Sequence, residues 1–170
     1  MVTPKPPRPE RRNRRPAAGS RSALEHGVAL LARREYSRHE LRRRMDARGF
    51  DAADAEAALA ELAARGWQSD ARYATLLARS RAAQGYGPRR IRMELAAQGI
   101  ARDEAQAAVQ ALDHDWTRAA TDLVRRRCGS LADAASRRRA AQMLLRRGFE
   151  TATVRCVTRT GIEDAADGED

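Results

Sequence analysis

The segment Leu41-Arg42-Arg43-Arg44-Met45-Asp46-Ala47-Arg48-Gly49-Phe50 contains a spacing that occurs three times in this 170-residue chain. Apolar residues stand eight and four positions before the glycine, and another apolar residue follows it directly. The same spacing surrounds two later glycines, with the residues Ile91, Leu95, Gly99 and Ile100, and then Ala140, Leu144, Gly148 and Phe149. These glycines are 50 and 49 residues apart, which indicates an internal repeat of about that length.

The repeat has the periodicity of α-helices. Apolar residues four apart lie on one face of a helix, and a glycine just after them favours a left-handed cap on which the next apolar residue folds back. Further helical patterns lie on both sides of each glycine, as at Leu24, Val28 and Leu31, at Leu59 and Leu62, at Val109 and Leu112, and at Val154 and Val157. Each unit is therefore expected to contain a long helix, a short one that ends at the glycine, and a third that begins just after it. Asp51 and Ser69 are expected N-caps.

The sequence predicts an all-α protein made of three tandem three-helix repeats in an elongated array. Alanine, leucine and arginine are abundant helix formers, and a unit of about 50 residues is marginal unless its neighbours support it. We expect repeats at residues 21–67, 68–116 and 117–161. A disordered basic tail is expected at 1–20 and a mobile acidic tail at 162–170. Trp67 and Trp116 close the first two repeats at nearly the same offset.

The chain has a net charge of +10, and all its basic residues except Lys5 are arginine. Such an excess attracts a polyanion or an acidic protein surface. Arginine clusters recur in the repeats, and helical angles direct Arg43, Arg89 and Arg92 away from the apolar positions, which predicts a continuous basic stripe. The candidate partner-binding residues are Arg33, Arg34, Arg42, Arg43, Arg89, Arg90, Arg92, Arg126, Arg138 and Arg146.

The sequence contains few groups that perform chemistry. The single lysine lies outside any phosphate-binding loop, and no catalytic triad or metal-ligand spacing occurs, so we expect no enzymatic activity, no cofactor and no metal. Cys128 and Cys156 are expected to be free and buried. No apolar run is long enough for a membrane span and no secretory signal is present, so we expect a cytoplasmic protein, with a monomer favoured.

Two segments resemble the RecX family of regulatory proteins. The opening segment Ala29–Ser37, with Glu40, Leu41, Gly49 and Phe50, is similar to the first module of that family. The middle segment, with Asp70, Tyr73, Arg79, Gly85-Tyr86-Gly87-Pro88-Arg89-Arg90-Ile91 and Gly99-Ile100, looks like its central module. The resemblance covers about residues 23–160. It implies a non-catalytic modulator, usually an inhibitor, that binds along the RecA recombinase filament and has some affinity for single- or double-stranded DNA.

Three other interpretations of the sequence stay open. Three-helix units with a glycine turn superficially resemble helix-turn-helix modules, which suggests a stand-alone DNA-binding protein. Against it, the expected third helices of the first two repeats are acidic or neutral, unlike a recognition helix. A scaffold for another acidic protein is the second alternative, and an enzyme is the third and the least supported.

Overall fold

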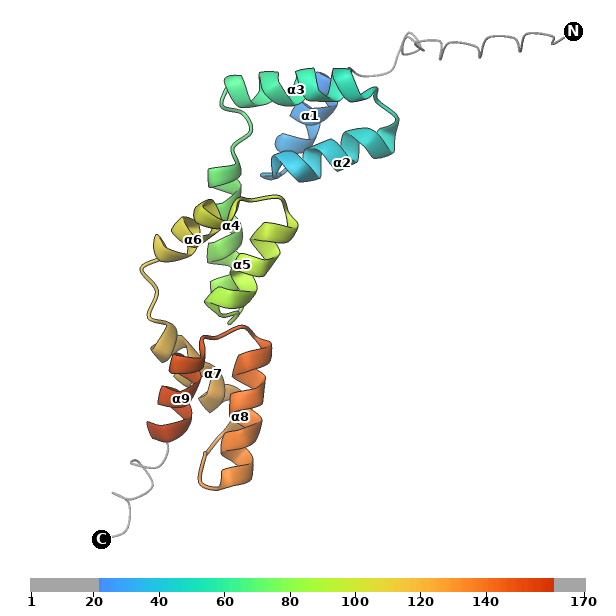
Figure 1. The fold of residues 1–170 in the computed structure, drawn as a ribbon. Coiled ribbons are helices and arrows are strands. Elements are labelled where there is room, and N and C mark those ends of the chain that lie inside the picture. The colour runs from blue at the N-terminus through green and yellow to red at the C-terminus, as the bar shows by residue number, and fades with distance from the viewer. Residues whose placement is uncertain (1–21, 161–170) are drawn as a thin grey trace, which may run out of the picture.

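The computed structural model describes residues 22–160, and all regular secondary structure in this range is α-helical (Figure 1). The helices in this range are α1 (Ala23–Leu31), α2 (Arg38–Arg48), α3 (Ala52–Ala64), α4 (Asp70–Ala83), α5 (Pro88–Ala97), α6 (Arg102–Gln110), α7 (Trp116–Cys128), α8 (Ala134–Arg146) and α9 (Thr151–Thr160). The two expected tails, at 1–20 and 162–170, lie outside the described residues.

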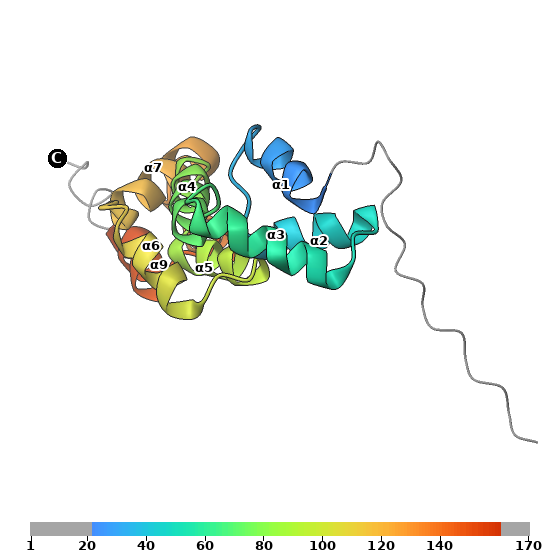
Figure 2. The same cartoon turned by 90° about the horizontal axis from the view of Figure 1, so that it is seen from above.

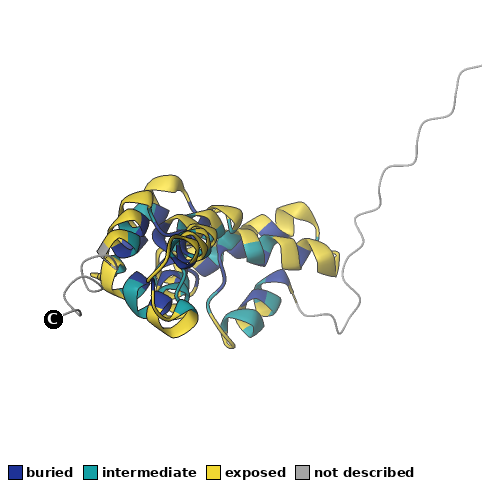
Figure 3. Ribbon diagram, turned by 90° about the horizontal axis from the view of Figure 1, so that it is seen from below, coloured by how far each residue is buried: buried dark blue, intermediate teal, exposed yellow. Residues whose placement is uncertain are grey.

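The helices form three successive groups, here called module 1 (α1–α3), module 2 (α4–α6) and module 3 (α7–α9). Each module has its own cluster of buried apolar side chains. The modules follow one another in an elongated array, and each helix turns its buried side inward (Figures 1 and 3). The prediction of an all-α array of three-helix repeats is confirmed.

The repeated glycines end the second helix of each module in the predicted way. Gly49 has a φ of 86°, its N–H donates to the Asp46 carbonyl at 3.0 Å, and the Phe50 N–H donates to the Met45 carbonyl at 3.2 Å. This pair of bonds defines the Schellman cap. Equivalent bonds and positive φ angles occur at Gly99 and Gly148. A local spacing therefore fixes where α2, α5 and α8 end.

The expected N-caps are also present. The Asp51 side chain accepts a hydrogen bond from the Ala53 N–H at the start of α3, and the Ser69 hydroxyl accepts one from the Arg72 N–H at the start of α4. Each bond satisfies a backbone donor that the first turn of a helix leaves without a partner.

Two details of the sequence interpretation are wrong. In module 1 the first helix is short, with 9 residues, whereas α3 has 13, because the chain leaves α1 at Leu31 to run extended to the Ser37 cap of α2. The cysteines are not both buried either. Cys128 is half-buried and Cys156 is exposed, since the inward positions of α9 are taken by Val154 and Val157.

Modules 2 and 3 are joined directly through their backbones. The Gly87 N–H donates to the Arg147 carbonyl at 2.8 Å, and the Arg89 N–H donates to the Gly148 carbonyl at 3.0 Å. A Cβ on Gly148 would lie 2.4 Å from the Arg90 backbone nitrogen, so only glycine permits this approach. The carbonyls beyond the end of α8 thus satisfy unpaired N–H groups at the start of α5.

The junction between modules 1 and 2 repeats this arrangement with side chains in place of backbone bonds. Gly99 lies against α2, since a Cβ there would be 2.8 Å from the His39 Cβ. The Arg38 N–H donates to the Asp70 carboxylate at 2.8 Å, and Arg72 pairs with Glu35 at 2.9 Å. The second helices α8, α5 and α2 therefore follow one another end to end, with α2 inclined across the top of α5 (Figure 1).

The two tryptophans are not equivalent in space. Trp116 begins α7 and packs against the cores of both module 2 and module 3, with its ring 6.5 Å from that of Phe149. Trp67 precedes α4 and is 45% exposed, with the Arg65 guanidinium over its ring. Trp116 therefore belongs to the junction between two modules, whereas Trp67 lies at the surface.

Replacing Gly148 with alanine should destabilise the protein more than the same change at Gly49. Both residues have φ near +85°, so alanine costs about 1–2 kcal/mol in backbone strain at either site. An added Cβ meets nothing within 4 Å at Gly49 but collides with the Arg90 backbone at Gly148. Urea unfolding should show at least twice the loss of stability for Gly148→Ala. Equal losses in the two variants would show that the junction does not depend on this contact.

Candidate partner-binding surface

Four of the ten arginines proposed from the sequence are neutralised by neighbouring carboxylates. Arg34 pairs with Glu40 at 2.6 Å, and Arg90 pairs with Glu94 at 2.9 Å. Arg42 bonds to both Asp46 and Glu56. The fourth, Arg92, is paired across a module junction, as described below. An arginine whose charge is already paired attracts an external anion less strongly.

The pairs around Tyr36 and Glu94 are built into their modules. The Arg34 guanidinium lies 3.8 Å from the centre of the Tyr36 ring, and Tyr36 is 5% exposed. Partial burial acts to raise the pKa of Glu94, but hydrogen bonds from Arg81 and Arg90 outweigh it and hold that pKa below its ordinary value. These arginines therefore stabilise modules 1 and 2 through internal contacts, and their charges are not presented to a partner.

Arg92 was expected to face outward, but the structure places it at the junction of modules 2 and 3. Its guanidinium bonds to the Glu150 carboxylate at 2.6 Å, and its side chain is 29% exposed. Helical angles alone did not reveal this contact, because Glu150 belongs to another module and is 58 residues away in the sequence. Arg92 is therefore a junction residue.

The other six proposed arginines are exposed, and within residues 22–160 they have no ion pair. They are Arg33 before α2, Arg43 on α2, Arg89 on α5, Arg126 on α7, and Arg138 and Arg146 on α8. The end-to-end helices α2, α5 and α8 bear four of them. Their charges are available to a partner.

The positive charge of the described residues is concentrated in module 3. Residues 116–160 contain eleven arginines and three acidic residues, whereas residues 22–67 contain eight of each and residues 68–115 contain seven arginines and six acidic residues. A basic stripe of even strength along the array is therefore not what the chain provides. Module 3 therefore has the most positive surface potential of the three.

This charge is spread over module 3. α8 ends against module 2, so its N-terminal half, which bears Arg137, Arg138 and Arg139, is farther from module 2 (Figure 1). α7 instead runs past the end of α4, and Arg126 in its last turn lies across a cleft from Ala82 and Ala83. The last turn of α7 therefore lies beside module 2.

Both arginine runs, 125–127 and 137–139, are visible in the sequence, but only Arg126 and Arg138 were proposed from it. How the two runs are placed depends on the directions of α7 and α8, which become visible once α8 is seen to end against module 2.

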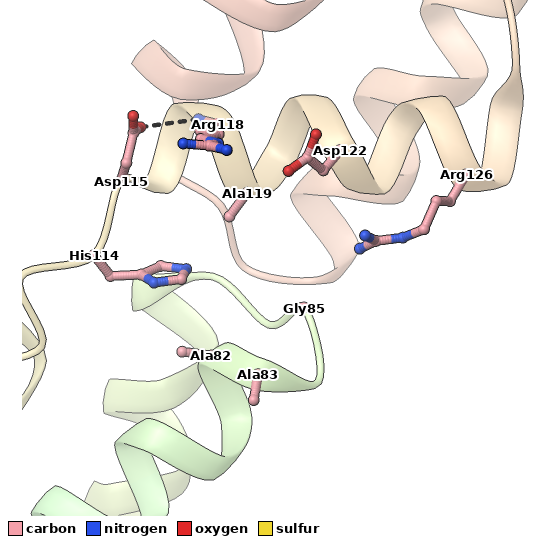
Figure 4. A pocket seen from close by; sticks show the side chains of 9 residues that line it. All are labelled: Ala82, Ala83, Gly85, His114, Asp115, Arg118, Ala119, Asp122 and Arg126. Carbon is pink, nitrogen blue, oxygen red and sulfur yellow. Dashed lines mark hydrogen bonds between the residues drawn. The ribbon is translucent and has the colours of Figure 1, made fainter.

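A cleft of about 390 Å³ lies between the end of α4 and α7, beside the junction of modules 2 and 3 (Figure 4). Arg118 and Arg126 stand along one side of it, and Ala82, Ala83 and Gly85 form the other. Of its two carboxylates, Asp115 caps α7 by accepting from the Arg118 N–H at 2.9 Å. The cleft thus adds Arg118, which sequence reasoning missed, to the arginines near module 3.

Two further findings concern the described residues as a whole. No helix within 22–160 is long and apolar enough to cross a membrane. In the same range, no group of three or more histidine, cysteine, aspartate or glutamate side chains is placed to hold a metal ion.

An elongated array of three-helix modules with exposed arginines defines a class of basic helical-repeat proteins, and comparisons with known proteins identify the family. Residues 23–62 match the family model "RecX, first three-helix domain", and residues 69–109 match "RecX, second three-helix domain". A relative named "Regulatory protein RecX" from Xanthomonas campestris pv. campestris (strain B100) is 45% identical to this chain, over 83% of this chain and 88% of its own length. A relative of the same name from Stenotrophomonas maltophilia (strain R551-3) is 44% identical, over 92% of this chain and 96% of its own length.

The chain belongs to the RecX family. The crystal structure of RecX from Lactobacillus salivarius has the same fold, with a TM-score of 0.72 at 17% identity over 81% of this chain and 93% of that one. The resemblance found in the sequence is thereby confirmed.

Reversing the charge of Arg92 should destabilise the array, and exchanging its charge with that of Glu150 should restore stability. Arg92→Glu places two carboxylates side by side, and the lost pair is worth about 1 kcal/mol. Arg89→Glu is the matched control, because Arg89 lies on the same helix and is unpaired among the described residues. Thermal unfolding should rank Arg92→Glu below both the control and the Arg92→Glu/Glu150→Arg double variant. No recovery in the double variant would contradict the assigned role.

Proposed function

We propose that this protein binds the RecA nucleoprotein filament in the cytoplasm and modulates it, usually by inhibiting its ATPase, strand-exchange and recombination activities. Membership of a family of regulatory proteins is the observation that supports this most directly. The proposal includes no chemical step, since the protein acts by occupying a surface.

The shape of the molecule suits a polymeric partner. Three small modules in a row give a long surface for their mass (Figure 1), and a helical filament presents repeated sites along a groove. Seen from above, modules 2 and 3 overlap and module 1 projects to one side (Figure 2). Contacts of modest strength to several subunits act together, because each raises the effective concentration of the next. A bound array obstructs entry of a second DNA duplex and hinders the subunit movements that accompany ATP turnover.

The outer faces of α5 and α8 combine charge with exposed apolar groups. Met93 is 66% exposed on α5, and Arg89 is an unpaired neighbour on the same helix. On α8, Leu145 is 44% exposed beside Arg146. Methionine and arginine are enriched at protein interfaces, where apolar anchors provide affinity and charges direct association. An acidic surface with apolar depressions is the complementary partner.

The protein should lower ATP hydrolysis by DNA-bound RecA, and Arg89→Glu should weaken this effect severalfold. Arg102→Glu is a matched control, because Arg102 is also exposed, unpaired among the described residues and in the first turn of its helix, but it lies on α6. RecA ATPase assays over a range of protein concentrations measure both effects. Unchanged RecA turnover at saturating protein, or equal losses in the two variants, would contradict the proposal.

A stand-alone DNA-binding role is the second candidate, and the charge of module 3 favours it. The third helices α3 and α6 begin with acidic residues, but α9 has Arg155 and Arg159 and no acidic residue. An excess of eight positive charges in one module favours phosphate contacts. If the protein has this second role, it binds DNA without any need for RecA.

Oligonucleotide binding in the absence of RecA separates the two candidates. Arg138→Glu/Arg139→Glu should lower affinity for single-stranded DNA and reduce the slope of affinity against salt by about 2, since each phosphate contact contributes close to 1. Arg102→Glu should leave the slope unchanged. Tight binding to DNA alone at physiological salt, with no gain from RecA, would favour the second candidate. Filament-dependent capture supports the first.

A further inference from the structure

We propose that the cleft between α4 and α7 binds the sugar–phosphate backbone of a single-stranded nucleic acid, and that it lies on a different side of the array from the outer faces of α5 and α8. Binding of nucleic acid by this chain is the second candidate function above, and the proposal rests on it. The supporting observations are the unpaired charges on both walls, a guanidinium beneath the cleft, and the side of the molecule on which it opens.

The α7 wall of the cleft carries two arginines whose charges are not neutralised. Arg118 and Arg126 are exposed, stand along the cleft in Figure 4, and have no ion pair within residues 22–160. They are eight positions apart, or about 12 Å along a helix, so they suit different phosphates of one strand better than a single small anion. Of the carboxylates on this wall, Asp115 caps α7, and Asp122 makes a long ion pair with Arg125 at 3.8 Å.

The α4 wall adds positive charge and no acid. Residues 71–83 contain three arginines and no acidic residue. Arg79 is exposed and unpaired among the described residues, and it lies one turn before Ala83 on the same face of α4. Ala83 lines the cleft, and the rest of this wall is also alanine and glycine. A strand can therefore approach α4 closely and still reach a guanidinium.

A guanidinium beneath the cleft offsets the repulsion that the end of α4 exerts on an anion. The last carbonyls of a helix carry a partial negative charge. Arg147 donates to the Gln84 carbonyl at 3.1 Å and to the Gly85 carbonyl at 3.4 Å, and it has no ion pair among the described residues. Because Gly85 lines the cleft, the charge of Arg147 acts on its contents. Four arginines without ion pairs thus lie in or next to a cleft that has two carboxylates.

The dimensions and the lining of the cleft favour a single strand. Its volume of about 390 Å³ is near the lower end of the range of small-molecule sites, about 300–1,000 Å³. A nucleotide is a group of that class, whereas a duplex is read by an element that enters its groove. The exposed His114 ring lines the cleft and packs edge-on against Trp116, with the ring centres 4.6 Å apart. A histidine held in this way offers an unpaired base a surface for stacking.

The cleft opens on a side of the molecule that the proposed filament surface does not use. Figure 2 shows α4 and α7 on one side of the overlapping modules 2 and 3, with α5, α6 and α9 on the other. Met93 and Leu145, the exposed apolar residues of the proposed filament surface, belong to α5 and α8. A strand in the cleft leaves them uncovered, so the protein can hold a single strand and a protein partner together.

Binding of a labelled oligothymidine in the absence of RecA tests the site. Arg118→Glu/Arg126→Glu should weaken binding about tenfold or more at low salt, with a difference that shrinks as salt is added. Arg43→Glu/Arg102→Glu is the matched control, because both residues are exposed and unpaired within residues 22–160 but lie on α2 and α6. The control should lose much less affinity. Equal losses would overturn the proposal, because net charge alone would then explain them.

A variant that fills the cleft without changing its charge separates shape from electrostatics. Ala83 is exposed, so Ala83→Phe should keep the helical content measured by circular dichroism and weaken oligothymidine binding severalfold. Unchanged affinity of this variant would overturn the proposal. Equally strong competition by an oligoglutamate of the same charge, or by duplex DNA, would overturn the choice of single-stranded nucleic acid. If the parent does not bind the oligonucleotide at low salt, this proposal and the second candidate fail together, whereas regulation of RecA is tested separately by the ATPase assay.

Discussion

The arrangement of this protein depends first on the backbone hydrogen bonds that join modules 2 and 3. The N–H groups of Gly87 and Arg89 donate to the carbonyls of Arg147 and Gly148, so the start of α5 and the end of α8 satisfy each other's unpaired groups. A module of about 45 residues buries too little apolar surface to be stable alone. The junction adds the stability that the small core of a single module lacks, and it does so mainly through contacts between main-chain atoms. Main-chain bonds depend little on side-chain identity, and the fold is shared with a RecX structure at 17% identity.

The parts of the fold that were predictable from sequence are those fixed by local geometry. Glycines at a constant distance after apolar pairs predicted the ends of α2, α5 and α8, because a left-handed cap involves only a few consecutive residues. The length of α1 and the burial of Cys156 were not predictable in this way. Both depend on which face of a helix meets the rest of its module. In short helices with much alanine, the periodicity of apolar residues that indicates this face is weak.

The partner-binding surface was predictable only as a set of candidates. The sequence shows where arginines stand, but it does not show which carboxylates reach them. Arg42 meets Glu56 from the next helix, and Arg92 meets Glu150 from the next module. Such pairs require the tertiary structure, and they divide the arginines into those that hold modules together and those that remain available.

The two junctions differ in a way that matters for a protein proposed to lie on a filament. Backbone bonds and the partly buried Trp116 ring join modules 2 and 3, whereas side chains such as Asp70 and the Arg72–Glu35 pair hold module 1. Exposed ion pairs contribute little, about 0–1 kcal/mol each, and salt weakens them. We therefore expect the junction of modules 2 and 3 to be the firmer of the two, and the nearly neutral module 1 to change its angle more easily than the strongly basic module 3. An array of this kind can follow the pitch of a helical partner and keep its strongest electrostatic contact in place.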